Sequence, residues 1–495
     1  MKNKKPFISI VIPTRQRHET LKYTIKTILN QNFNNYQIII GDNNSTKETK
    51  DVVKEFNSNK INYYRSNVDL SLADSYEFSV SKATGEYIMV MADNDGIIEG
   101  GLEFIVDILN INNNPLVINF IKNNYNWPCL KDGENNILFL HKNNPSIERI
   151  DGFDLIQKIL DNNGMFYKLP MIYNSIVHHS LIKKMKKKTG KIFNSVTPDT
   201  YSGFCIAMLS KNFLKLNYPI TIAGNSSKSL GVNYLNTNNG IIKKENESRK
   251  ESEIQLHSLC PLVSSHTTHL IDSFLRATET LEVNKFLFDR KKVLLDIIND
   301  LYAFNESELD TNINTILNSC NDDIKLQTFI KNYININKPK IKQSYKKNTI
   351  PLGFIQNRLK LDGKTFNLST IYDVSKFMTN FYNYSINFIN YPNLSKDYSN
   401  IEQNSTIAIW GNGEYGKHFL KIIKEQRKDL KILCIIDSFK ENNNSFPKVL
   451  TPNKLPQNID YIIMASSYIK DISQLIKKYS LDKTSIILTY YKEEN

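Results

Sequence analysis

The sequence predicts an α/β protein with a mostly parallel N-terminal sheet, a helical middle segment and a small second α/β unit at the C-terminus. Strand-like and helix-like segments alternate over the first hundred residues, and the same alternation returns after residue 405. A chain of 495 residues is long enough for two or three domains. We therefore expect domains at 1–235, 236–400 and 401–495.

The N-terminal alternation is regular enough to assign each element. Because each strand is followed by a helix, the strands should run parallel, with helices on both faces of the sheet. Ser45 followed by Glu48 is the spacing of a capping box at the start of the second helix. The expected strands are 7–12, 36–42, 61–65 and 86–93, and the expected helices are 18–31, 45–57 and 72–84.

Composition narrows the function classes. The net charge is +13, and the most compact basic run spans 182–191. That run is interpreted as a solvated helix end, with a phosphate or lipid contact as the alternative. Nucleic acid is not expected as a partner, because the aromatic residues do not alternate with a basic stripe.

The expected location is the cytoplasm, including the inner face of the membrane as a peripheral site. The five cysteines are odd in number and form no C-x-x-C motif, which suits free thiols in a reducing compartment. The N-terminal apolar run of about six residues stops at Pro13, too short for a signal peptide. No stretch reaches the roughly 18 apolar residues that span a bilayer.

Polar residues follow the predicted strands where the carboxyl ends should share one edge of the sheet. They are residues 13–15, Asp42 and residues 93–95, the last in the stretch MVMADND. Ligands of parallel α/β sheets bind at this edge. Two carboxylates one residue apart suit a hard cation such as Mg²⁺ or Mn²⁺, which would neutralise a leaving diphosphate. A D-x-D taken alone is a weak signal that more often marks a surface turn, but the apolar strand before it and the other strand-end residues favour a binding site here.

Several spaced blocks together resemble a known family. They look like the nucleotide-binding half of a family 2 glycosyltransferase with the GT-A fold, closely over residues 6–100 and more loosely to about 235. The blocks are FISIVIPTRQRHETLKYTIKTILNQ, YQIIIGDNNSTKET and YYRSNVDLSLADSYEFSVSKATGEYIMVMADND.

The resemblance implies roles for individual residues. Asp42 would hydrogen-bond the base, usually uracil, and Asp93 would face the ribose. Asp95, together with Asp93, would bind Mn²⁺ or Mg²⁺ and through it the diphosphate. The family often has Asp where this chain has Asn94 and Asn where it has Ser75. The residues expected around the nucleotide sugar are Pro13, Thr14, Arg15, Arg17, Asp42, Asn44, Asp93 and Asn94.

Transfer of a sugar also needs a general base. The acceptor hydroxyl must lose its proton as it attacks the anomeric carbon, on the face opposite the leaving diphosphate. Asp199, in SVTPDTYSGFCIAML, resembles the family's catalytic base, and the alternative is a helix N-cap. The resemblance also suggests acceptor or loop contacts for AGNSSKS at 223–229 and inversion at the anomeric carbon.

The C-terminal unit carries a separate signal. A strand at 406–410 leads into Gly411-x-Gly413-x-x-Gly416 and a helix, and a second strand at 431–436 ends at Asp437. This is the dinucleotide-binding fingerprint in its required context, so NAD(P) or another nucleotide is the expected ligand. The unit resembles Rossmann-like domains appended to surface-polysaccharide enzymes, and the alternative is a docking unit that binds nothing.

The sequence thus predicts an inverting, metal-dependent glycosyltransferase. It would move a sugar from a nucleotide-diphosphate donor, expected to be a UDP-sugar, onto a glycan or lipid-linked glycan of a surface polysaccharide such as capsule or lipopolysaccharide. Two alternatives stay open. One is a bifunctional protein whose C-terminal domain binds or modifies a sugar nucleotide with NAD(P). The other is a non-catalytic binding protein with the GT-A fold, for which Asn94 and Ser75 are the support.

Overall fold

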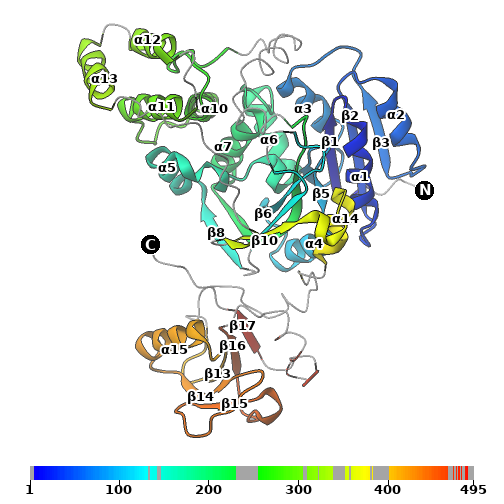
Figure 1. Ribbon diagram of the computed structural model, residues 1–495, viewed down its shortest axis with the longest axis vertical. Coiled ribbons are helices and arrows are strands. Elements are labelled where there is room, and N and C mark those ends of the chain that lie inside the picture. Colours follow the sequence, from blue (N-terminus) through cyan, green and yellow to red (C-terminus); the bar gives the residue numbers. More distant parts are fainter. Residues whose placement is uncertain are drawn as a thin grey trace.

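The computed structural model combines a large mixed α/β sheet, a group of helices and a smaller parallel sheet (Figure 1). It describes residues 5–131, 134–141, 146–229, 255–304, 309–320, 323–337, 352–355, 358–379, 382, 401–465, 472, 475, 478–479, 481 and 485–488.

The first half of the large sheet is parallel, as predicted. Its strands lie side by side in the order β4-β1-β2-β3. The strands are β1 (Ile8–Thr14), β2 (Tyr36–Asp42), β3 (Ile61–Arg65) and β4 (Tyr87–Val90), and the helices between them are α1 (His18–Leu29), α2 (Lys47–Lys54) and α3 (Leu72–Val80). The predicted alternation of strand and helix is confirmed over this region.

The register of these strands brings their carboxyl ends together. Thr14 at the end of β1 lies opposite Asp42 at the end of β2. The predicted capping box is wrong: α2 has Thr46 as its N-cap, without a side-chain cap. The hydroxyl of Ser45 instead accepts a hydrogen bond of 2.9 Å from the backbone N–H of Gln16, so it joins the two strand-end loops.

The second half turns the sheet into a mixed one. β9 pairs antiparallel with both β4 and β6, while β10 runs parallel to β6 and antiparallel to β5 and β8. The elements are β5 (Gly96–Ile97), α4 (Gly101–Ile111), β6 (Val117–Asn126), β7 (Ile137–His141), β8 (Ile147–Asp151), α5 (Gly152–Asp161), η1 (Asn163–Lys168), η2 (Ile172–Asn174), β9 (Ser175–His178), α6 (His179–Thr189), α7 (Pro198–Ser210) and β10 (Asn212–Asn225).

A segment from beyond residue 350 returns to this sheet. β12 (Arg358–Asp362) pairs antiparallel with β7 and with β11 (Gly353–Ile355). After η3 (Gly363–Phe366), α14 (Ile371–Met378) packs beside α1, and Ser375 donates 2.7 Å to the carbonyl of Ile97 (Figure 1). The boundaries predicted at 235 and 400 remain predictions, and this return of the chain to the first sheet was not predicted.

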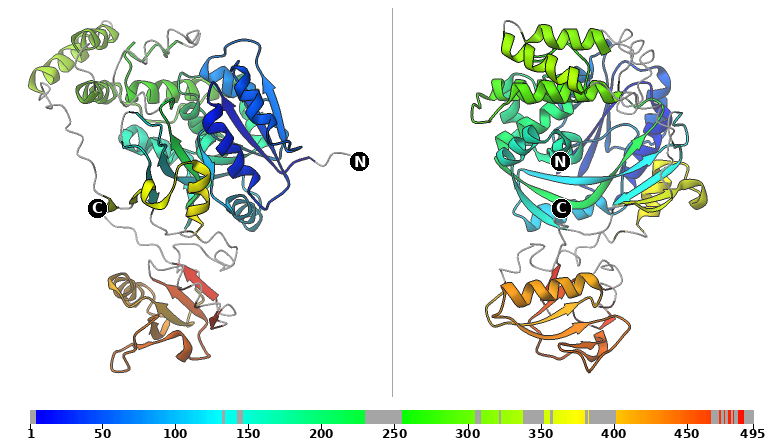
Figure 2. Two further views of the ribbon diagram at one scale, coloured as in Figure 1. Left: turned by 45° about the vertical axis from the view of Figure 1, so that its right-hand side comes forward. Right: turned by 60° about the vertical axis from the view of Figure 1, so that its left-hand side comes forward.

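A group of helices packs against α7 on one side of the large sheet. They are α10 (His266–Leu281), α11 (Arg290–Phe304), α12 (Leu309–Ser319) and α13 (Ile324–Ile336). α10 contacts α7 directly, and the two share a core that includes Phe204 and Phe274, whose rings lie 5.6 Å apart. The helices are therefore joined to the sheet through α7 (Figure 2).

The C-terminal sheet is parallel throughout its described strands. Their order is β15-β14-β13-β16-β17, so the direction of strand addition reverses at β13. The elements are β13 (Thr406–Trp410), α15 (Glu414–Gln426), β14 (Lys431–Ile436), β15 (Lys448–Leu450), η6 (Pro452–Lys454), β16 (Tyr461–Met464) and β17 (Ser485–Leu488). Ile407, Ile409 and Ile463 pack against Ile423 of α15 in a core of their own.

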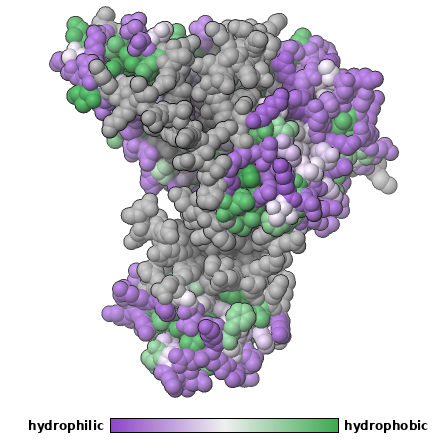
Figure 3. All heavy atoms as spheres, viewed as in Figure 1, coloured by the Kyte–Doolittle hydropathy of each residue, from purple (hydrophilic) through white to green (hydrophobic). Residues whose placement is uncertain are grey.

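The outer surface over α2 and β3 is mainly hydrophilic (Figure 3). This matches the burial of these elements, whose apolar residues, such as Val53, face the sheet. Within the described part of the chain, no helix is both long and apolar enough to cross a membrane.

Candidate active site

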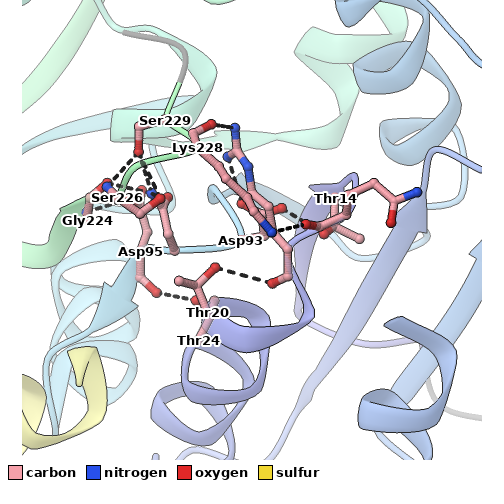
Figure 4. Close-up of polar contacts among 12 residues, drawn as sticks. Thr14, Thr20, Thr24, Asp93, Asp95, Gly224, Ser226, Lys228 and Ser229 are labelled. Carbon is pink, nitrogen blue, oxygen red and sulfur yellow. Dashed lines mark hydrogen bonds and ion pairs between the residues drawn. The ribbon is translucent and has the colours of Figure 1, made fainter. Parts of the chain in front are cut away.

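Asp93 follows the end of β4 and is held by groups from the β1 end. Its carboxylate accepts 2.7 Å from the hydroxyl of Thr14 and 3.0 Å from the guanidinium of Arg17 (Figure 4). Arg17 also donates to the backbone carbonyl of Lys228, so it bridges β1 and the segment after β10. The structure therefore brings together Thr14, Arg17 and Asp93, which the sequence placed in one site.

Asp95 is equally buried and is held from the opposite side. One carboxylate oxygen accepts 2.9 Å from the ammonium of Lys122 on β6, and the other accepts 2.9 Å from the backbone N–H of Gly224. The backbone carbonyl of Asp95 accepts 2.7 Å from the hydroxyl of Thr24 on α1 (Figure 4). Lys122 was not expected from the sequence, because it sits mid-strand outside every motif.

Asn94, between the two aspartates, bonds to the end of β10 and the segment that follows it. Its amide nitrogen donates 2.7 Å to the carbonyl of Gly224 and 2.8 Å to the hydroxyl of Ser229. The indole of Trp127 in turn donates 3.1 Å to the carbonyl of Asn94. The segment 223–229 is thus bonded to residues 93–95, which we call the acidic turn. Of the two predicted roles for this segment, acceptor contact and loop contact, these bonds favour the loop contact.

Gly224 makes this contact sterically feasible. A Cβ atom at this position would lie 1.8 Å from the carbonyl oxygen of Asn94 and 2.7 Å from the indole nitrogen of Trp127. Real side-chain atoms do not approach so closely, so only glycine allows the end of β10 to reach the acidic turn.

Asp42 lies at the neighbouring strand end and is completely buried. It accepts 2.9 Å from the backbone N–H of Ser45 and a further hydrogen bond from the hydroxyl of Tyr63. The Arg65 guanidinium lies 3.9 Å away. In this arrangement Asp42 organises the loop, and its predicted contact with a nucleobase stays a prediction.

The loops after β1 and β2 have unusual backbones. Gln16 and Asn44 both adopt positive φ, at 55° and 49°. Non-glycine residues rarely do so, and such positions concentrate at functional sites. Asp69 links the loops on the exposed side: it pairs with Arg15 at 2.9 Å and accepts 3.0 Å from the amide of Asn44.

Pro13 lies within strand β1 and not in the loop after the strand, where it was predicted. It is still within β1, opposite Gly41 of β2, one residue before the strand ends at Thr14. The strand therefore ends later than predicted, and Pro13 fixes the chain direction into the loop.

Asp199 lies in the first turn of α7 and is not the N-cap residue of that helix. Thr197 holds the cap position without a side-chain bond, and Pro198 occupies the first turn beside Asp199. The Asp199 carboxylate accepts 2.9 Å from the N–H of Thr200. Burial raises the pKa of this carboxyl, although the Thr200 bond and the charge of Lys122 act against the rise.

The pKa values of two tyrosines respond to the charges of both Asp199 and Asp95. Burial raises the pKa of both Tyr76 and Tyr173, and the charges of Asp199 and Asp95 raise it further. The ammonium of Lys122 lies 4.4 Å from the centre of the Tyr173 ring. Tyr173 is therefore influenced by the charges of Asp199 and Asp95 and also contacts the Lys122 ammonium.

The carboxylates do not fit a divalent cation as they are arranged. Each oxygen of Asp93 and Asp95 already accepts a hydrogen bond, and each carboxylate pairs with its own positive side chain. Among the residues described, no three His, Cys, Asp or Glu side chains gather as a metal site. A cation on Asp95 would meet the Lys122 ammonium and be repelled by it.

Comparison with known proteins places this region in a family. The model described as Glycosyl transferase family 2 matches residues 9–144, which include β1 to β4 and the acidic turn. Residues 9–144 form a family 2 glycosyltransferase domain. Enzymes with this fold commonly use a divalent metal, which makes the pairing of Asp95 with Lys122 notable.

Two curated relatives match the glycosyltransferase domain. A Campylobacter jejuni GalNAc(5)-diNAcBac-PP-undecaprenol beta-1,3-glucosyltransferase is 30% identical over 108 residues, 21% of this chain and 35% of that protein. An Escherichia coli UDP-Glc:alpha-D-GlcNAc-diphosphoundecaprenol beta-1,3-glucosyltransferase, WfgD, is 25% identical over 118 residues, 24% of this chain and 45% of that protein. The chain thus spans less than half the length of these relatives.

Among solved structures, S. aureus TarS 1–349 in complex with UDP-GlcNAc aligns with a TM-score of 0.42 and 12% identity. The alignment covers 63% of this chain and 81% of that chain.

A buried polar cluster joins α10 to the segment that precedes Asp199. Asp272 on α10 accepts 2.7 Å from the hydroxyl of Ser195 and 2.8 Å from the guanidinium of Arg276. Thr197 bonds at 2.8 Å to Ser273, the next residue of α10. The helices after residue 265 therefore hold the segment that leads into Asp199.

The second predicted site lies at the end of β13. Gly411 has φ of 138°, and a Cβ on Gly416 would lie 1.9 Å from the Gly411 carbonyl oxygen. Gly413 is the N-cap of α15, with no side-chain cap. Asp437, after β14, accepts 2.9 Å from the N–H of Phe439 in its own turn. The glycines thus shape a tight loop before a helix, as the fingerprint predicts.

Proposed function

We propose that this chain is an inverting glycosyltransferase. It would move a sugar from a nucleotide-diphosphate donor, which we expect to be a UDP-sugar, onto a lipid-linked glycan acceptor. The observation that carries the proposal is the placement of Asp93 and Asp95, held by Arg17 and Lys122, at the strand-end edge of a family 2 glycosyltransferase domain. One relative is named for UDP-Glc, and both are named for lipid diphosphate acceptors, which supports the donor and the acceptor class.

In the proposed reaction Asp199 is the general base. Its carboxylate takes the proton of the acceptor hydroxyl, whose oxygen attacks the anomeric carbon of the donor sugar. The bond from that carbon to the diphosphate oxygen breaks, and the electron pair leaves with the nucleoside diphosphate. A raised pKa makes Asp199 a stronger base than an exposed aspartate once it is ionised. Inversion follows because attack and departure occur on opposite faces.

Arg17 and the backbone around it would position the donor. Thr14 and Arg17 hold Asp93, so the ribose contact proposed for Asp93 would be made by a fixed carboxylate. The loops that carry Arg15 and Asn44 are open on their outer side, where a nucleobase would enter beside Asp42. These assignments rest on the resemblance and on the shared strand edge.

A thermal-shift panel tests the donor assignment. UDP, GDP, CDP, ADP and NAD(P) would be added to the full chain and to Asp93→Asn, with Asp51→Asn on the exposed side of α2 as the matched control. We expect UDP to raise the Tm of the parent and of Asp51→Asn, and the rise to be lost in Asp93→Asn. No response to any nucleoside diphosphate, or an equal response in Asp93→Asn, would reject the proposed donor site.

The C-terminal domain is proposed to bind a nucleotide phosphate separately. The strand order, with its reversal at β13, is that of a dinucleotide-binding sheet, and Gly411, Gly413 and Gly416 leave the backbone accessible to a phosphate. Isothermal titration of NAD(P) and UDP-sugars into Gly416→Ala and the parent tests this. Binding of NAD(P) that vanishes in the variant supports the bifunctional alternative, and no binding supports a docking unit.

The basic end of α6 is proposed to be a solvated helix end, with a peripheral membrane contact as the alternative. One lysine of α6 and one just after the helix are already paired: Lys186 with Glu77 at 3.0 Å and Lys191 with Asp74 at 3.4 Å. These pairs favour the solvated-helix interpretation over a lipid contact. Co-sedimentation with anionic and neutral vesicles separates the two, because a lipid contact requires more protein in the anionic pellet.

A further inference from the structure

The two carboxylates that could hold a metal are each neutralised by a side chain of this protein. Asp93 pairs with Arg17 and Asp95 pairs with Lys122, at 3.0 and 2.9 Å. Both pairs are largely shielded from solvent, with exposed fractions of 17% for the Arg17 side chain and 11% for that of Lys122. A divalent ion would have to displace at least one cation from a buried pair, which is costly.

Lys122 also occupies a place that suits a diphosphate. It comes from the middle of β6, so its long side chain reaches the acidic turn from across the sheet. Its ammonium contacts Asp95, lies over the Tyr173 ring and acts on the charge of Asp199. An ammonium has three N–H donors, and one donor is used by Asp95, so others remain for phosphate oxygens.

One further cation, Arg17, is held against the acidic turn by Asp93. Arg17 donates to Asp93 and to the carbonyl of Lys228. The ammonium of Lys228 donates a hydrogen bond of 2.9 Å to the backbone carbonyl of Gln16 (Figure 4). The Arg17 guanidinium on Asp93 and the Lys122 ammonium on Asp95 thus bring two positive charges to residues 93–95, which is the arrangement needed to stabilise a leaving group that gains negative charge.

We propose that the Lys122 ammonium binds the donor diphosphate in the place that a divalent cation takes in metal-dependent enzymes of this fold, so that donor binding and transfer do not require a metal. This inference rests on the proposed function and specifies its leaving-group chemistry. As the anomeric C–O bond breaks, the diphosphate oxygen takes the electron pair, and the nearby ammonium stabilises that charge without giving up its proton.

The test is UDP binding by isothermal titration, with the full chain in EDTA and in Mn²⁺. Lys122→Met keeps the length and removes the charge, and Lys122→Arg keeps a charge in case Lys122→Met fails to fold. We expect the parent to bind UDP within a factor of two under both conditions. Lys122→Met should lose 10- to 100-fold of its UDP affinity in EDTA, while its affinity for UMP, which lacks the second phosphate, should change less than threefold.

Mn²⁺ gives a second readout on the same variant. Removal of Lys122 frees an oxygen of Asp95, so Mn²⁺ should restore at least tenfold of the lost UDP affinity in Lys122→Met. Lys122→Arg should stay independent of Mn²⁺. The matched control is Lys360→Met, which removes another buried lysine paired with a carboxylate, Glu134, at 2.6 Å on β12. Its UDP affinity should equal that of the parent.

The outcomes separate this inference from the proposed function. Binding of UDP by the parent that is lost in EDTA and recovered in Mn²⁺ would overturn the role of Lys122 and leave the glycosyltransferase proposal intact. Equal losses for UDP and UMP in Lys122→Met would also overturn it, because the residue would then be structural. Absence of UDP binding in the parent under both conditions would overturn the donor proposal itself.

Discussion

The large and small sheets share a strand order, β3-β2-β1-β4 and β15-β14-β13-β16, but different chemical groups line the carboxyl ends of these strands. At the end of β1 and β4, charged side chains from distant parts of the chain meet, as in the pairs Arg17–Asp93 and Lys122–Asp95. At the end of β13, the loop is shaped by Gly411 and Gly416, and the backbone at the start of α15 is the group proposed to meet a phosphate there.

The difference indicates what each edge can do. Paired charges and a partly buried base can stabilise a developing charge and move a proton, which a group-transfer reaction needs. A glycine loop before a helix can bind a phosphate, but binding alone is not catalysis. We therefore assign the chemistry to the N-terminal edge and binding to the C-terminal edge, and the following predictions test that division.

The largest effect is expected from Asp199→Asn. Loss of the general base should lower the rate of transfer by about 10²- to 10⁴-fold. The affinity for UDP should change little, since Asp199 is proposed to contact the acceptor. Asp154→Asn, an acidic residue in the first turn of α5, is the matched control and should retain full activity. An active Asp199→Asn would favour the non-catalytic alternative.

Glycine substitutions sharpen the comparison between the edges. Gly224→Ala should reduce transfer by about 10- to 100-fold, because the added Cβ would displace Asn94 at a strain of about 1–3 kcal/mol. Gly416→Ala should leave transfer intact and lower the stability of the C-terminal domain alone. Gly413→Ala is its control, since nothing lies within 4 Å of the added Cβ. Transfer assays and calorimetry of each variant provide the measurements.

A smaller effect is expected where the helical segment supports the base. Asp272→Asn removes the charge that holds Ser195 and Arg276, which should cost about 1.5–3 kcal/mol of stability. It should also lower kcat several-fold while the UDP affinity stays unchanged, because Asp272 acts through the segment before Asp199. A change in UDP affinity that exceeds the change in kcat would contradict a positioning role.

The smallest expected effect is on pH dependence. Burial raises the pKa of Asp199 above its usual value, and the base works only when ionised. The transfer rate should therefore fall as the pH drops through a pKa higher than that of an exposed aspartate. Because the Lys122 charge opposes the rise, Lys122→Met should move this acid limb to higher pH. A limb that stays in place would contradict contact between the two charges.

Much of the fold was predictable because local signals agreed with the topology. The strands at 36–42, 61–65, 406–410 and 431–436 begin and end at the predicted residues. The return of β12 and α14 to the large sheet was not predictable, since their partners lie more than 200 residues earlier and no short-range pattern records such pairing.

The candidate site was predictable in part for the same reason. Thr14, Arg17, Asp93 and Asp95 follow strand ends, which a periodic sequence locates, and the structure brings them together. Lys122 was missed, because a lysine inside a strand is usually taken for a solvent-facing residue and only the fold shows that it meets Asp95. Tyr76 on α3 and Tyr173 on η2, whose pKa values the charge of Asp199 raises, were missed because neither residue lies at a strand end.

Hydrogen exchange of the full chain with and without saturating UDP tests the division between the edges most directly. The account predicts slower exchange in the segments 12–17, 92–96 and 223–229, which bear Arg17, Asp95 and Gly224, and unchanged exchange in 411–416 and 437–440. Protection confined to 411–416 and 437–440 would contradict it, because the nucleotide diphosphate would then belong to the glycine loop and not to the paired charges.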